Sequence, residues 1–212
     1  MSLLPPDDDL DLLHTRDYET RVYQLSDREL LVRGVVSDRK PPGLYVESDP
    51  DPLEMHQMQL ELQVSLPDLT ITRARVLFET HPHGNCPRIA DDYEKLVGLS
   101  IARGFNHKIR DLFGGPKGCT HTNALLQAMA PAVVQSTWSL SVRRSRAGNE
   151  SPGTRNPAER DKRIAANTNT CHIWSEDGEH IAALRRGDRS GVAPLPVRDR
   201  LQKLGLDKEH WN

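Results

Sequence analysis

The alternation of hydrophobic and polar residues predicts four β-strands within the first 80 residues. Segments 16–25 and 30–37 are rich in β-favouring residues and flank the polar turn SDRE. In HQMQLELQVSL every second residue is apolar, which indicates a strand with one buried face. TITRARVLFE also alternates, but Ile71 is out of phase, so we expect a hairpin with a bulge or a frame shift there. The proline-rich segment 37–54, between the two pairs, is expected to be a loop.

The spacing of apolar residues changes to a helical period after residue 85. In CPRIADDYEKLVG, Pro87 suits the first turn of a helix and Gly98 suits its end. SIARGFNHKIRDLFGG predicts a second, shorter helix, and a long apolar stripe predicts a third from near Thr120, which Pro131 would bend or interrupt. The pattern as a whole predicts an α+β fold, with a small, mainly antiparallel sheet and about three helices packed on one face.

The remaining segments suggest the domain organisation. Residues 1–14 are expected to be a disordered acidic arm, followed by one α+β domain over 15–185. Within it, the polar stretch 143–170 loses the apolar pattern and is either a solvated excursion, a lid or a partner surface. Residues 171–187, CHIWSEDGEHIAALRRG, fit strand–turn–strand with Asp-Gly at the turn. We expect 186–212 to be a tail with one short helix.

Composition and charge narrow the classes of partner and compartment. The 212 residues carry 28 basic and 30 acidic side chains, a net charge of −2, which gives no reason to expect nucleic acid or an anionic membrane as a partner. No apolar stretch approaches the roughly 20 residues that span a bilayer, and the acidic N-terminus does not resemble a secretory signal. An odd count of three cysteines indicates reduced thiols in the cytoplasm rather than a disulfide framework.

Six motifs are spread over roughly residues 14–185: TRDYETRVY…GVVSD, H-x-M-x-L-x-L-x-V, C-P-x-I-A…L-V-G, A-R-G-F, G-C-T-H-x-x-A-L-L-x-A-M and C-H-I-W…D-G. Together these motifs resemble the bacterial DUF2889 family. The resemblance implies no particular activity. In architecture the chain is also similar to the NifU/IscU iron–sulfur scaffold proteins, which implies that Cys86 and Cys119 stand at two of their three ligand positions. Their first ligand motif, Cys-Gly-Asp, is replaced here by Glu54-Met55-His56.

A cysteine and a histidine open the predicted third helix, directly after the glycine-rich stretch GGPKG. Free backbone N–H groups and the helix dipole favour negative charge at such a position, so Cys119 suits a metal ligand or a nucleophile. The alternative is a small buried cysteine that packs behind the turn. Cys86 opens its own helix in the same way.

From these positions we predict a metal site of Cys86, Cys119, His56 and His121, suited to zinc or iron. The same region supplies the candidate catalytic residues Cys119, His121, His56 and Arg103. Arg103 is either an anion clamp or a solvated helix charge. The spacing is no established metal signature, so core cysteines or a metal-free pocket stay as alternatives. His81 and His83 are reserve ligands.

Two kinds of function remain. The first is an enzyme of lyase or hydrolase type that acts on a small organic molecule, through a metal or through a thiolate and a general base. The second is a non-catalytic metal or iron–sulfur carrier, or an adaptor that uses the basic segment 143–163. No G-x-S-x-G or H-E-x-x-H sequence supports catalysis of the Ser/His/Asp type or of the zinc-protease type. No nucleotide-binding fingerprint such as a P-loop is present either, so no nucleotide cofactor is expected. Oligomeric state is left open.

Overall fold

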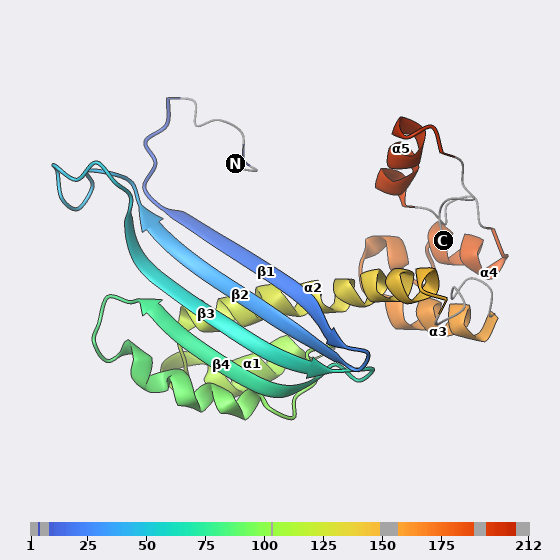
Figure 1. Cartoon of the computed structure of the whole chain (residues 1–212), viewed down its shortest axis with the longest axis horizontal. Helices are drawn as coiled ribbons and strands as arrows, with labels where there is room; N and C mark the ends of the chain where they lie inside the picture. The colour runs from blue at the N-terminus through green and yellow to red at the C-terminus, as the bar shows by residue number, and fades with distance from the viewer. Residues whose placement is uncertain (1–3, 5–8, 103, 149–156, 189–193, 207–212) are drawn as a thin grey trace. The chain divides into compact units, whose positions relative to one another are not determined.

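The chain forms two compact units, residues 1–137 and 138–212, which are described separately. The structure is a computed structural model that describes residues 4, 9–102, 104–148, 157–188 and 194–206 (Figure 1). The long helix α2 begins in the first unit and ends in the second.

The first unit is built on a four-stranded antiparallel sheet with the strands in sequence order. The strands are β1 (Thr15–Ser26), β2 (Glu29–Lys40), β3 (Leu53–Ser65) and β4 (Thr70–Thr80). They confirm the four predicted strands. The loop predicted over 37–54 is too long at both ends, because β2 continues to Lys40 and β3 already begins at Leu53.

The irregularity predicted near Ile71 is a β-bulge. Gln63 pairs with Arg73 while its neighbour Val64 pairs with Ile71, so Thr72 has no partner in β3. The extra residue returns Ile71 to the inner face of the sheet, where its side chain is fully buried.

One face of the sheet is covered by the 3-10 helix η1 (Cys86–Leu96), α1 (Phe105–Phe113) and the first part of α2 (Thr120–Arg146) (Figure 1). The short 3-10 helix η2 (Gly115–Lys117) lies between α1 and α2 in the chain. Pro131 is exposed and lies inside α2 without ending it. Where α2 crosses β2, a Cβ atom on Gly34 would stand 2.5 Å from the sulfur of Met129. This glycine therefore lets the helix approach the sheet closely.

The second unit is helical where it is described. It contains α3 (Pro157–Asn167), the 3-10 turn η3 (His172–Trp174), α4 (Glu179–Arg185) and α5 (Leu195–Lys203). The strand–turn–strand predicted over 171–187 is wrong. The run EHIAALR consists mostly of strong helix formers, and Gly178 is the N-cap of α4 rather than part of a hairpin turn.

The described elements confirm the α+β class, with an antiparallel sheet and helices on one face. None of the helices within the described ranges combines the length and the apolar character that crossing a bilayer requires.

Candidate metal centre

Three side chains form a row across neighbouring strands on the helix-covered face of the sheet. Arg16 of β1 stands opposite Asp38 of β2, and Asp38 stands opposite His56 of β3. Directly beyond this row, β3 carries a bulge, because Arg39 pairs with Glu54 and Met55 is left out. Directly opposite residues on one face lie close enough for their side chains to interact. The sheet register alone therefore places a guanidinium, a carboxylate and an imidazole together.

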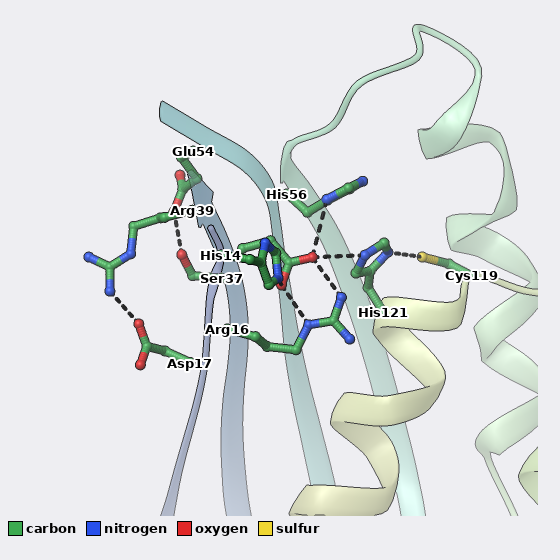
Figure 2. A network of polar contacts seen from close by, with 10 residues as sticks. His14, Arg16, Asp17, Ser37, Arg39, Glu54, His56, Cys119 and His121 are labelled. Atoms are coloured by element: carbon green, nitrogen blue, oxygen red, sulfur yellow. Dashed lines mark hydrogen bonds and ion pairs between the residues drawn. The ribbon is translucent and has the colours of Figure 1, made fainter. Parts of the chain in front are cut away.

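The first turn of α2 adds His121 to this row (Figure 2). That turn is fixed by the buried Tyr93 of η1, whose hydroxyl accepts a hydrogen bond from the Cys119 N–H at 2.8 Å. The same hydroxyl donates to Asn123 Oδ1 at 2.9 Å, and Asn123 Nδ2 donates to the Phe113 carbonyl at 2.7 Å. A Cβ at Gly118 would lie 2.5 Å from that carbonyl, so the glycine-rich stretch lets the chain pass closely enough to begin α2 here.

Four side chains converge on the Asp38 carboxylate, whose side chain is only 2% exposed. Arg16 forms a two-point ion pair, with Nε 2.5 Å from Oδ1 and Nη2 2.6 Å from Oδ2. His121 Nε2 lies 3.0 Å and His56 Nδ1 3.3 Å from Oδ2, while His14 Nε2 lies 3.4 Å from Oδ1. The rings of His56 and His121 stack with centroids 3.9 Å apart. The imidazoles of His56 and His121 therefore both approach the carboxylate at Oδ2.

Electrostatics keep this cluster in the protonation states that bind metal ions. Burial alone would raise the pKa of Asp38, but the Arg16 guanidinium, helped by His121 and His14, lowers that pKa to about 2. Burial lowers the pKa of His56, although Asp38 raises it in part. Burial and the neighbouring His56 lower the pKa of His121. At neutral pH the cluster thus offers an ionised carboxylate and two neutral imidazoles, the forms that act as ligands.

The spacing of these groups is close enough for them to hold one metal ion. One ligand atom each from Asp38, His56 and His121 lies within 4.8 Å of the other two. Metal bonds of about 2.1 Å place neighbouring ligand atoms about 3.0 to 3.4 Å apart. The measured Oδ2–Nε2 and Oδ2–Nδ1 distances, 3.0 and 3.3 Å, fall in that range. His56 Nδ1 is moreover buried without a hydrogen bond, despite its nearness to Asp38. A buried ring nitrogen that makes no hydrogen bond is costly, and a metal ion bound to it would satisfy it.

The sequence-predicted site residues are divided between this cluster and its surroundings. His56 and His121 lie together. Cys119 lies beside them, with Sγ 3.8 Å from His121 Nδ1, the ring nitrogen that does not face Asp38. Cys86 opens η1, where its N–H donates to the His83 carbonyl at 3.0 Å, and it is not in the three-residue group. Arg103 lies outside the described residues. Metal ligation by Cys86 and Cys119 stays a prediction.

Sequence reasoning missed Asp38, Arg16 and His14. The assignment of Asp38 to a loop hid it, although a signal was present: Leu30, Val32, Gly34 and Val36 are buried at alternate positions, and Asp38 continues their series. A carboxylate at an inward-facing strand position needs partners, since buried charges are otherwise costly.

The opposite, open face of the sheet also carries a hollow, of about 520 Å³. Its lining includes Arg33, Gln59 and Leu77, whose side chains point away from the helices. The Arg33–Glu61 ion pair crosses it with an Nε–Oε2 distance of 2.9 Å. This hollow and the Asp38 cluster lie on opposite faces of the same strands.

Comparison with known proteins gives one match. Residues 14–135, which include all five residues of the cluster, match the family described as "Protein of unknown function (DUF2889)". No curated protein matches the chain. No solved structure matches it either. Because the match covers more than half of the 212 residues, the chain belongs to the DUF2889 family.

Proposed function

We propose that the chain is an enzyme of lyase or hydrolase type that binds one divalent zinc or iron ion through Asp38, His56 and His121. The observation that carries this proposal is the convergence of three ligand atoms within 4.8 Å, one of them a buried imidazole nitrogen without a hydrogen bond. Two imidazoles and one carboxylate suit zinc and ferrous iron in particular.

The number of protein ligands supports catalysis rather than a structural role or a carrier. Three protein ligands leave coordination positions for water and substrate, whereas structural zinc sites are closed by four. A bound ion would lower the pKa of a coordinated water and polarise a substrate carbonyl or phosphoryl oxygen. A carrier would hold its ligands at the surface for transfer, but the Asp38 side chain is 2% exposed and that of His121 16%.

A metal-free thiol enzyme is the second candidate, and one observation favours it. Cys119 Sγ, His121 and Asp38 lie in line, with Sγ 3.8 Å from Nδ1 and Nε2 3.0 Å from Oδ2. This is the order of a thiol, a base and an orienting carboxylate. The lowered pKa of His121 opposes it, because a thiolate paired with an imidazolium needs a readily protonated ring. We therefore rank metal chemistry first.

Elemental analysis of the untagged full-length chain separates the two candidates. The metal proposal expects one zinc or iron per chain in the wild type, little in His121→Gln and in His56→Gln, and a full complement in His81→Gln, which alters a histidine outside the group. The thiol proposal expects no stoichiometric metal, together with rapid alkylation of Cys119 by iodoacetamide that slows in His121→Gln. A wild type that binds no metal after incubation with either ion would overturn the metal proposal.

A further inference from the structure

Metal binding at this cluster would leave its charge unbalanced. A divalent ion and the Arg16 guanidinium carry three positive charges against the single negative charge of Asp38, since both ligand imidazoles are neutral. Among the residues that the structure describes, Asp38 is the one carboxylate found in an ion pair with His14, Arg16, His56 or His121. A partly buried site with excess positive charge favours an anionic ligand.

Arg16 and His14 lie on the solvent side of the ligands. Asp38 is 2% exposed and the ligand imidazoles are 16% and 22% exposed, whereas the side chains of Arg16 and His14 are 36% and 38% exposed. A molecule that approaches the ligands from solvent therefore meets the Arg16 guanidinium and the His14 imidazole first. A cationic guanidinium at the entrance of a site attracts anions and orients them.

Arg16 has donors to spare for such a molecule. The guanidinium carries five N–H groups, and its contacts with Asp38 use only Nε and Nη2. The Tyr18 side chain is one further partner of the guanidinium, so two of its five N–H groups remain for a ligand. The geometry of a guanidinium fork matches a carboxylate or a phosphate oxygen pair. The His14 imidazole adds a second polar group for an oxyanion to meet, and its Nε2 lies 3.4 Å from Asp38 Oδ1.

We propose that the substrate of this site bears an oxyanion group, a carboxylate or a phosphate, which binds between the metal ion, Arg16 and His14. This inference rests on the metal binding proposed above and adds the chemical class of the ligand. The anion balances the excess positive charge and directs the adjacent bond of the substrate toward the metal ion.

Cobalt(II) binding tests the metal site and the anion site in one experiment, and its results show which of the two proposals is wrong. The metal-free full-length chain is titrated with Co²⁺ in a buffer without coordinating anions, and its visible absorption is recorded. Acetate, inorganic phosphate and neutral acetamide are then added to separate samples. We expect saturable changes in the Co²⁺ bands with acetate or phosphate and none with acetamide, and the tighter of the two anions identifies the group. Absence of protein-bound Co²⁺ bands contradicts the metal site itself. Bands that form but respond to neither anion overturn the present inference alone.

Two variants test the assigned residues. Arg16→Lys keeps a positive charge beside Asp38, and His14→Ala leaves the Arg16–Asp38 pair in place. We expect both to bind Co²⁺ and to bind the anion about tenfold more weakly, which corresponds to about 1.4 kcal/mol. Arg21→Lys, on the open face of the sheet, is the matched control and should bind the anion like the wild type. Unchanged anion affinity in both Arg16→Lys and His14→Ala would show that the anion lies elsewhere.

Discussion

Replacing Asp38 by asparagine removes the one negative charge on which His14, Arg16, His56 and His121 converge. The Asp38 pKa falls from its ordinary 3.8 to about 2 on folding. Each pKa unit corresponds to about 1.4 kcal/mol, so the ionised carboxylate stabilises the metal-free fold by about 2 kcal/mol at pH 7. The 36% exposed Arg16 stays hydrated after the substitution, which keeps the loss near this value rather than near the larger cost of a stranded buried charge.

The pH dependence follows from the direction of the shift. Because the folded-state pKa is the lower one, the stabilisation is complete above about pH 4 and is lost as the pH falls through about 2. The free energies of unfolding of wild type and Asp38→Asn should therefore differ by about 2 kcal/mol at pH 7 and converge at low pH.

Urea denaturation of the metal-free chain measures this difference. Circular dichroism is the appropriate probe for the first unit, because the three tryptophans, Trp138, Trp174 and Trp211, all lie outside it. Glu61→Gln serves as control, since it breaks an exposed ion pair and should cost less than about 1 kcal/mol. An Asp38→Asn variant as stable as the control at pH 7, or a difference that persists unchanged at pH 3, would refute the reasoning.

Two further substitutions test how α2 is positioned. Gly34→Val should lower the free energy of unfolding by about 1–3 kcal/mol, because the added atoms collide with Met129. In the Gly34→Val background, Met129→Ala should restore part of that loss. Urea denaturation of the two single variants and the double variant measures this coupling, and losses that simply add in the double variant would contradict the collision. Tyr93→Phe should lower the free energy of unfolding by about 1–3 kcal/mol, since the Cys119 N–H and the Asn123 side chain lose the hydroxyl that they share. The substitution should also weaken Zn²⁺ binding, which equilibrium dialysis measures. Unchanged zinc affinity would mean that the Tyr93 hydroxyl does not position His121.

The sequence predicted those parts of the fold in which a local period coincides with burial. Alternation in HQMQLELQVSL identified β3, and the phase error of Ile71 identified the bulge, because both follow from a single buried face. Residues 171–187 were misread, since a short apolar stretch beside Asp-Gly fits a hairpin or a helix equally well. Helix propensity in EHIAALR decided the outcome there.

The sequence can predict the candidate site only in part, for a physical reason. His56 and His121 were accessible to sequence reasoning because each stands at the start of an element with a clear pattern. Asp38 and Arg16 were not, since their proximity depends on the register of three strands, which pairs Arg16 with Asp38 and Asp38 with His56. Register is a long-range property that turn geometry and burial decide jointly.

X-ray absorption spectroscopy of the zinc-loaded, full-length chain tests the central claim most directly, because it reports the ligand atoms themselves. Ligation by Asp38, His56 and His121 predicts a first shell of nitrogen and oxygen at about 2.0–2.2 Å with the outer-shell scattering of two imidazoles. A Zn–S distance of about 2.3 Å would contradict that set and would return Cys119 or Cys86 to the first coordination shell.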